Sequence, residues 1–264
     1  MKVITDHVCC NGMTMDYFTF GEGAKPFVIL PGLSLMSVIP MAPAVAAQYK
    51  DIAACYKVYL FDRKRDVEQG YTIRQMADDT ARAMKALGIA GACLMGCSQG
   101  GMIAQLLAAQ YPQLVSHLIL CSTAARPSEL GTKVIGRWVE LAKAGDVVAL
   151  NRDVFRRVYS QQYFDRYRDA FDYAENLGTP GDMARFVKLA QSCEGFDATA
   201  QLADIQCPVL VMGSNIDNVL SGEPSRYLAQ QLNAPLVMYD DCGHAAYDEA
   251  PDYHSHILDF LSTC

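Results

Sequence analysis

A serine flanked by glycines is the residue of this chain best suited to covalent chemistry. It is Ser98, in the segment GCSQGG at residues 96–101. A short apolar run at residues 92–95 predicts a strand before it, and a helical pattern at residues 99–111 predicts a helix after it. On such a sharp turn the hydroxyl points out at the edge of a sheet, and the glycines avoid collisions with neighbouring backbone. The pattern predicts a nucleophile at Ser98; the alternative is a glycine-rich turn with an incidental serine.

A serine hydroxyl is a weak nucleophile and needs a base that is itself held in place. The chain has five histidines, at positions 7, 117, 244, 254 and 256. His117 begins an apolar strand, and His254 and His256 lie two apart in a helical pattern and so point to different faces. His244 follows the last predicted strand, at the sheet edge where Ser98 is expected. His244 is therefore the predicted base.

The acid that orients the histidine should come from another loop at the same edge. Asp217 follows the apolar run at residues 209–212, and it lies after the serine and before the histidine in the chain. Asp240 and Asp241 compete for this role, although they sit three or four residues from His244 and would also be ordinary loop charges. We favour Asp217. It gives the chain order Ser…Asp…His, which is found where a nucleophilic serine lies on a strand-to-helix turn of an α/β sheet.

The elements that position these residues form an alternating pattern. Apolar runs without polar alternation, typical of buried parallel strands, alternate with helical patterns. An Asn11-Gly12 turn earlier in the chain predicts an antiparallel hairpin at the start of the sheet, and Thr72 with Gln75 predicts a capping box. The pattern predicts an α/β protein with a mostly parallel, doubly wound sheet and an antiparallel N-terminal hairpin. The apolar runs are residues 27–30, 58–61, 92–95, 118–121, 209–212 and 236–239.

Residues 126–200 interrupt the alternation with helical patterns and no convincing strand. This stretch carries 10 of the 25 aromatic residues and 11 of the 22 basic residues, balanced by 11 acidic ones. An aromatic-rich helical insertion between two strands is typical of a lid over a pocket. The alternative is a group of surface helices that covers no site. We expect one domain over residues 1–264 with a helical cap inserted at 126–200.

The chain resembles the α/β-hydrolase fold superfamily, in the branch with a helical cap. The resemblance covers most of the chain and rests on the Ser98 segment and on Gly243-His244, with Glu249 and Pro251 behind them. Weaker support comes from LPGLS at residues 30–34, from DR at 62–63 and from the segment 207–217. Many relatives have His-Gly where this chain has Pro31-Gly32.

The resemblance implies an oxyanion hole made of the backbone N–H groups of Leu33 and Gln99. It also implies that Asp62 and Arg63 form a structural ion pair rather than a catalytic one. A serine at position 98 argues against the dehalogenase and epoxide-hydrolase relatives, which use an aspartate there.

Composition narrows the classes of partner. With 51% hydrophobic and 19% charged residues, the chain is not of the disordered type. A net charge of −7 disfavours a nucleic-acid partner. Two long uncharged stretches are broken by proline and glycine, so no membrane insertion is expected. Ten cysteines without a CxxC pair or a signal peptide predict reduced, buried thiols and a cytoplasmic location. The sequence has no cluster with metal-site spacing and no phosphate-binding loop, so no metal or cofactor is expected.

These features together favour a cofactor-free serine hydrolase that cleaves a carboxylic ester of a small or medium, partly apolar substrate through an acyl-enzyme. The alternatives within this fold are a C–C bond hydrolase, a thioesterase or an acyltransferase. A small-molecule receptor without turnover is the alternative outside enzymes. The sequence does not fix the oligomeric state.

Overall fold

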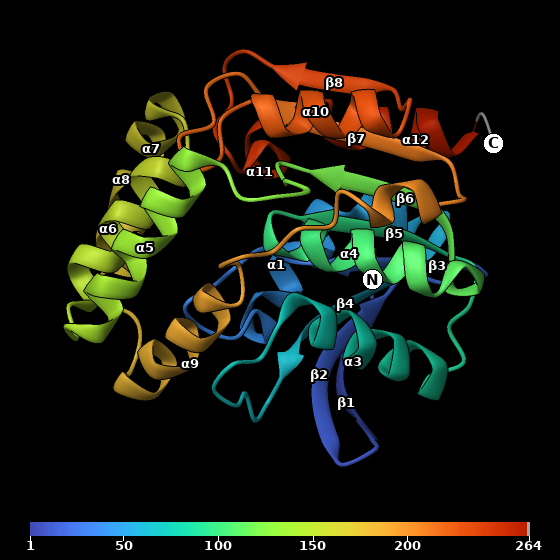
Figure 1. Ribbon diagram of the computed structural model, residues 1–264, viewed down its shortest axis with the longest axis horizontal. Coiled ribbons are helices and arrows are strands. Elements are labelled where there is room, and N and C mark those ends of the chain that lie inside the picture. The colour runs from blue at the N-terminus through green and yellow to red at the C-terminus, as the bar shows by residue number, and fades with distance from the viewer. Residues whose placement is uncertain (263–264) are drawn as a thin grey trace.

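Eight strands form one sheet in the computed structural model, which describes residues 1–262 (Figure 1). The strand order is β1-β2-β4-β3-β5-β6-β7-β8. β1 and β2 pair antiparallel, as do β2 and β4, and every later pairing is parallel. The sheet confirms the predicted architecture. The strands are β1 (Ile4–Cys10), β2 (Met13–Phe20), β3 (Lys25–Leu30), β4 (Tyr56–Lys64), β5 (Ala92–Cys97), β6 (Val115–Cys121), β7 (Val209–Ser214) and β8 (Leu236–Tyr239).

The N-terminal hairpin turns at the residues that the sequence indicated. Asn11 and Gly12 connect β1 to β2 with positive φ angles of 46° and 77°. Two successive residues with positive φ define the turn type whose twist matches antiparallel strands, and glycine and asparagine tolerate this conformation best. The hairpin projects from one edge of the sheet in Figure 1.

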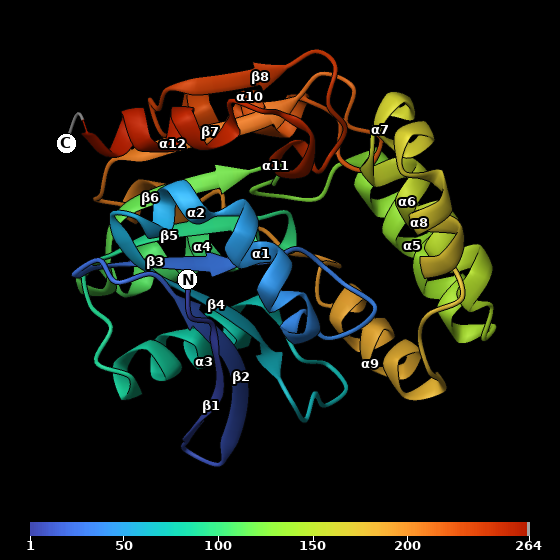
Figure 2. The ribbon, with the colours of Figure 1, turned by 180° about the vertical axis from the view of Figure 1, so that it is seen from behind.

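Helices cover both faces of the sheet. α3, α4 and α10 pack on one face, where they build the larger apolar core (Figure 1). α1, α2 and α12 pack on the other face with their own core (Figure 2). The bounds are α1 (Ala42–Gln48), α2 (Lys50–Ala53), α3 (Ile73–Ala86), α4 (Gln99–Gln110), α10 (Glu223–Gln231), α11 (Ala246–Glu249) and α12 (Tyr253–Ser262), with 3-10 turns at Ile39–Met41, Pro112–Leu114 and Gln201–Asp204.

The predicted capping box at the start of α3 is confirmed. Thr72 Oγ1 accepts a hydrogen bond from Gln75 N at 3.2 Å, and Gln75 Oε1 accepts one from Thr72 N at 2.9 Å. This reciprocal pair satisfies two backbone donors that the first helical turn would leave free. Gly88 follows the helix with a φ of 68°, the conformation that commonly ends a helix at glycine.

One strand differs from the expectation of a fully buried parallel strand. Within residues 1–262, β8 pairs with β7 alone and forms an edge of the sheet. Leu236 at its start is 36% exposed, and within β8 only Tyr239 is buried. An uninterrupted apolar run of four residues cannot distinguish an edge strand from a central one, because its position depends on which strands pair with it.

The segment between β6 and β7 contains five helices and, within residues 126–200, no strand. These helices, here called the helical insertion, lie beyond the carboxyl ends of the parallel strands (Figures 1 and 2). Side chains of Ser128, Asp146, Ser160 and Thr179 each accept a hydrogen bond at a helix start and so fix the helix boundaries. The helices are α5 (Glu129–Lys143), α6 (Val147–Val158), α7 (Gln161–Arg166), α8 (Arg168–Ala174) and α9 (Pro180–Gln191).

All nine cysteines of the described chain are free thiols. Five of them are buried, which fits the prediction for those positions, whereas Cys9 and Cys55 are exposed and Cys10 and Cys207 are half-buried. Cys264 lies outside the described residues. Within residues 1–262, no helix has the length and apolar character needed to cross a membrane. The five buried cysteines are Cys93, Cys97, Cys121, Cys193 and Cys242.

Candidate active site

The candidate site lies where the strand order changes direction. β3 pairs with β4 on one side and with β5 on the other, and Leu30 is opposite Gly96 in the parallel register. Loops leaving the carboxyl ends of two such strands diverge to opposite faces of the sheet and leave a crevice between them. The loop after Leu30 and the turn at Ser98 are these two loops.

Ser98 occupies a strained turn between β5 and α4. Its backbone has φ 51° and ψ −119°, a conformation that non-glycine residues rarely adopt. Such strain costs about 1–3 kcal/mol and persists only where the surroundings fix it. Here Ser98 N donates to the Cys121 carbonyl at 2.9 Å, and the Thr123 hydroxyl donates to the Ser98 carbonyl at 2.7 Å. β6 and the residues that follow it therefore hold the serine in place.

The glycines around Ser98 allow a very close approach of backbone segments. A Cβ atom on Gly96 would lie 2.5 Å from the Gly100 carbonyl oxygen. On Gly100 it would lie 2.0 Å from the Leu30 carbonyl oxygen, and on Gly101 it would lie 2.5 Å from the Thr123 side chain. Side chains would displace the turn from β3 and β6, which confirms the steric reason for glycine at these positions.

Gly100→Ala is expected to lower the free energy of unfolding by about 1–3 kcal/mol, because the added methyl group meets rigid backbone. The matched control is Gly136→Ala, in the interior of α5, where an added Cβ meets nothing within 4 Å. The control should gain about 0.5–1 kcal/mol from the higher helix propensity of alanine. Urea denaturation measures both. Equal effects at the two positions would contradict the close approach at Gly100.

Asp217 and His244 form a buried pair at the same edge of the sheet. His244 Nδ1 lies 2.7 Å from Asp217 Oδ2, and their side chains are 7% and 2% exposed. The other carboxylate oxygen, Oδ1, accepts hydrogen bonds from the backbone of Val219 at 2.7 Å and Leu220 at 2.9 Å. The carboxylate is thus satisfied on both oxygens, and the imidazole Nδ1 is fixed facing it.

The competing acids lie elsewhere. Asp240 is exposed and binds the Asn215 side chain, and the nearest partner of the exposed Asp241 is the Cys242 thiol at 3.5 Å. Neither carboxylate is hydrogen-bonded to His244 in the described residues. Among the other histidines, His117 lies inside β6 with its Nδ1 3.0 Å from Ser116 Oγ, as expected for a structural residue. The geometry therefore favours Asp217 as the partner of His244.

Within residues 1–262, the Ser98 hydroxyl makes no hydrogen bond, including none to His244. In structures without substrate, the bonds between catalytic groups are often long and tighten only in the reacting complex. The structure thus joins two of the three predicted residues directly and places the third at the end of β5, on the edge from which β7 leads to Asp217.

The loop after β3 lies against the serine. A Cβ atom on Gly32 would lie 3.3 Å from Ser98 Cβ and 3.9 Å from Ser98 Oγ. Leu33 follows directly, and its side chain packs against apolar residues of the helical insertion. Gly32 therefore lies against the Ser98 side chain, and Gln99 at the N-terminus of α4 follows Ser98 directly in the chain.

The side chain of Gln99 is buried and bonded at both ends. Its amide nitrogen donates to the Leu189 carbonyl at 2.7 Å and to Ser192 Oγ at 3.2 Å, both at the end of α9. Its amide oxygen accepts from Arg63 Nε at 3.3 Å and Nη2 at 3.2 Å. Sequence reasoning assigned Gln99 a role through its backbone alone and missed these contacts.

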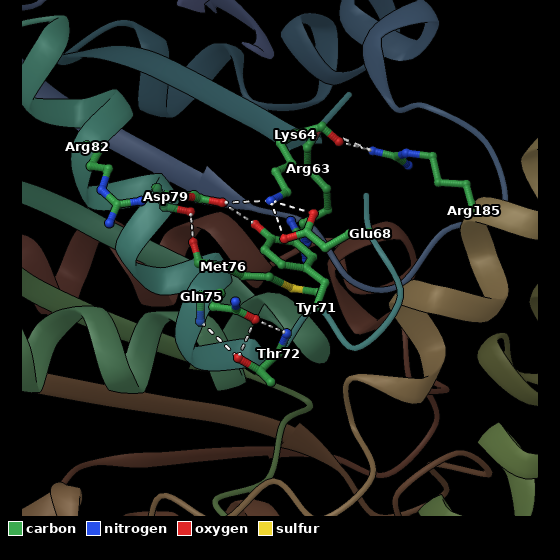
Figure 3. A network of polar contacts seen from close by, with 11 residues as sticks. Arg63, Lys64, Glu68, Tyr71, Thr72, Gln75, Met76, Asp79, Arg82 and Arg185 are labelled. Carbon is green, nitrogen blue, oxygen red and sulfur yellow. Dashed lines mark hydrogen bonds and ion pairs between the residues drawn. The ribbon is translucent and has the colours of Figure 1, made fainter. Parts of the chain in front are cut away.

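The predicted ion pair between Asp62 and Arg63 is wrong. Asp62 accepts the backbone N–H of Arg63 at 2.6 Å, and its charged partner is Arg185 of α9 at 3.4 Å. The Arg63 guanidinium turns toward Gln99 and the Pro31 carbonyl instead. Neighbours in a strand point to opposite faces, so adjacent charges are poorly placed to pair. Figure 3 shows Arg185 reaching from α9 to the backbone at the end of β4.

The helical insertion is bonded to the loop that carries His244. A single carboxylate oxygen of Glu249 accepts from Gly243 N at 2.9 Å and from Ser160 N at 3.0 Å. Ala245 N donates to the Val158 carbonyl at 3.0 Å, and a Cβ on Gly243 would meet that same carbonyl at 2.5 Å. Glycine before His244 thus permits the insertion to approach the loop closely.

An apolar cluster links the insertion to both remaining loops of the site. It joins Trp138 and Phe186 of the insertion to Val219 and Leu220, which follow Asp217. Leu33 and Leu35 pack against it from the loop after β3. The residues flanking Ser98, Asp217 and His244 therefore all contact the helical insertion.

Among residues 1–262, no group of three or more His, Cys, Asp or Glu side chains is arranged to bind a metal ion.

Comparison with known proteins identifies the class. The sequence pattern of the alpha/beta hydrolase fold matches residues 25–251, and the chain belongs to this family. It is 20% identical to 3-oxoadipate enol-lactonase 2 of Acinetobacter baylyi over 256 residues, which cover 96% of this chain and 95% of that protein. It is 23% identical to serine hydrolase BPHL of Mus musculus over 242 residues, 87% of this chain and 76% of that protein.

Solved structures agree with this assignment. The fold matches MGS-M2, an alpha/beta hydrolase from a Medee basin deep-sea metagenome library, with a TM-score of 0.88, 25% identity and 97% coverage of both chains. It also matches the enol-lactonase of Burkholderia xenovorans LB400 with a TM-score of 0.84 and 24% identity, covering 97% of this chain and 100% of that one. The chain is therefore a hydrolase of the α/β fold.

Proposed function

We propose that the chain is a serine hydrolase that cleaves carboxylic esters through an acyl-enzyme. The observation that carries the proposal is the buried Asp217–His244 pair at 2.7 Å, at the same edge of the sheet as a serine held at a φ of 51° on the turn before α4. Backbone strain of this kind gathers at functional sites, and a buried carboxylate hydrogen-bonded to histidine Nδ1 is the arrangement that orients a catalytic base.

In the proposed mechanism, His244 Nε2 removes the hydroxyl proton of Ser98 as Oγ attacks the substrate carbonyl. The electron pair of the carbonyl moves to its oxygen, and a tetrahedral intermediate forms. His244 then gives the proton to the leaving alcohol, the bond to that alcohol breaks, and the acyl group remains on Ser98. Water repeats the sequence and releases the acid. Asp217 fixes the tautomer of His244 and stabilises its cationic form.

The negative oxygen of the intermediate is proposed to bind the backbone N–H groups of Leu33 and Gln99. Two observations support this oxyanion hole. Gly32 lies against the Ser98 side chain, and Gln99 begins α4, whose N-terminal N–H groups carry partial positive charge. Each such donor typically contributes about 3–4 kcal/mol to transition-state stabilisation.

The helical insertion, residues 126–200, is proposed to act as the cap over this site within one domain. Its bonds to the His244 loop and its apolar contacts with Leu33 and Leu220 support that placement. Because the cluster facing the site loops is apolar, the proposed substrate is a small or medium ester with apolar character. No cofactor is needed for the proposed steps.

Ester cleavage is preferred over the other reactions of the same triad. The relative in Acinetobacter baylyi is named as an enol-lactonase, and a lactone is a cyclic ester; the mouse relative is named as a serine hydrolase. C–C bond hydrolysis, thioester hydrolysis and acyl transfer use the same groups. The family assignment disfavours the receptor without turnover, which was the alternative outside enzymes.

A substrate panel tests the proposed function. Purified protein is offered p-nitrophenyl esters of increasing acyl length, an acyl thioester and a vinylogous diketone, and product formation is followed over time. We expect esters to be hydrolysed fastest, with a preference for acyl length that reports the size of the site that takes the acyl group. Faster cleavage of the diketone would indicate a C–C hydrolase, and tight binding without product would indicate a receptor.

A further inference from the structure

Arg63 is a buried cation that reaches both halves of the proposed oxyanion hole. Its guanidinium donates to the Pro31 carbonyl at 2.8 Å and to the side chain of Gln99 at 3.2 and 3.3 Å. Pro31 lies two residues before Leu33, whose backbone N–H is one proposed donor. Gln99 supplies the other donor. No other side chain of the described residues bonds to both segments.

Within the described residues the Arg63 side chain makes no hydrogen bond to a carboxylate, although the neighbouring Asp62 charge raises its pKa against the effect of burial. Lys64, Glu68, Asp79 and Arg82 satisfy one another nearby, with Lys64 Nζ 2.8 Å from Glu68 and Arg82 2.8 Å from Asp79 (Figure 3). Arg63 itself is 6% exposed, and its side-chain bonds go to neutral oxygens. Burying a charge is costly unless hydrogen bonds compensate it, and the acceptors that compensate this one belong to the two segments that flank Ser98.

The cation persists at neutral pH. Burial lowers the pKa of Arg63 to about 10, which leaves the guanidinium protonated under ordinary conditions. Hydrogen bonds from a charged donor are roughly twice as strong as neutral ones, and the planar guanidinium presents its donors in a fixed geometry. A neutral or flexible side chain would not hold the two segments in the same register.

We propose that Arg63 is a positioning residue that fixes the spacing of the Leu33 and Gln99 N–H groups. The guanidinium joins the loop after β3 to the start of α4, and Gln99 continues the connection to Leu189 of the helical insertion. The inference rests on the proposed function, because it concerns the oxyanion hole of that mechanism. Through these N–H groups, Arg63 stabilises the tetrahedral intermediate more than the bound ester.

The test compares Arg63→Met, Arg63→Lys and wild type on p-nitrophenyl butyrate, with inhibition by a trifluoromethyl ketone that forms a tetrahedral adduct with serine. Small displacements of catalytic groups cost up to about 100-fold, so we expect Arg63→Met to lose about that factor in kcat. KM should change little, and the inhibition constant of the ketone should rise in parallel with the loss in kcat. Arg63→Lys should recover part of both, since it keeps the charge but not the fork.

Arg82→Met is the matched control, since it removes a cation of the neighbouring network that contacts Asp79 and not the site. It should retain the wild-type kcat and inhibition constant. If Arg63→Met does not fold, Gln99→Met cuts the same connection from its other end and keeps the backbone N–H. Its kcat and ketone inhibition should then show the same parallel loss.

Two failures are distinguishable. If Ser98→Ala abolishes hydrolysis but the Arg63 and Gln99 variants lose only thermal stability, with kcat and ketone inhibition unchanged, Arg63 is structural and this inference is overturned. If Ser98→Ala still hydrolyses the ester at the wild-type rate, the proposed function itself fails.

Discussion

Ser98→Ala is expected to lower kcat for ester hydrolysis by about 10⁴-fold or more, because removing a serine nucleophile costs factors of this size or larger in comparable enzymes. The backbone of Ser98 is held from both sides by β6 and the residues after it, so the substitution should leave the fold intact. Steady-state rates with p-nitrophenyl butyrate measure the effect, and circular dichroism checks the fold.

Ser122→Ala provides a matched control. Ser122 also has a positive φ, 41°, and it follows the neighbouring strand β6. Its substitution removes the same hydroxyl from the same kind of backbone at the adjacent strand end. We expect near wild-type rates. If the two variants lost activity equally, or if Ser98→Ala kept its rate, the assignment of Ser98 as nucleophile would be wrong.

Asp217→Asn should lower kcat by about 10⁴-fold while the protein remains folded. An amide in this position can present an N–H₂ group to His244 Nδ1, where the carboxylate now lies at 2.7 Å. The imidazole would then carry its proton on Nε2 and could not accept the proton of Ser98. Steady-state rates with p-nitrophenyl butyrate measure the loss, and circular dichroism checks the fold.

The competing acids supply the controls for this variant. Asp240→Asn and Asp241→Asn make the same chemical change within the loop that carries His244, at exposed carboxylates that do not contact it. Both should retain activity close to wild type. A large loss at either position with little loss at Asp217 would reassign the acid of the triad.

Local signals were sufficient to predict most of the fold. The hairpin turn at Asn11-Gly12 and the capping box at Thr72 depend on residues close together in the chain, and both formed as expected. Buried parallel strands are recognisable as short apolar runs, because helices cover both of their faces. The edge position of β8 escaped prediction because it depends on the absence of a further strand beside it.

The candidate site was predictable only where a short sequence motif requires a particular local backbone geometry. The glycines around Ser98 indicate a tight turn. The pairing of Asp217 with His244 was predicted from their order in the chain and from their positions after the carboxyl ends of two parallel strands. The partner of Arg63 could not be predicted in this way. It is Gln99, which is 36 residues away and is itself oriented by Leu189, a further 90 residues along the chain. Long-range contacts made by the helical insertion carry no local sequence signal.

Covalent labelling tests the central claim most directly. The protein is treated with an alkyl p-nitrophenyl phosphonate, whose phosphorus is attacked by activated serine hydroxyls, and the adduct is located by peptide mass spectrometry. The mechanism predicts one stoichiometric adduct on Ser98, absent from Ser98→Ala and formed far more slowly in Asp217→Asn. An unlabelled Ser98 in folded protein, or an adduct that forms at the same rate without Asp217, would contradict it.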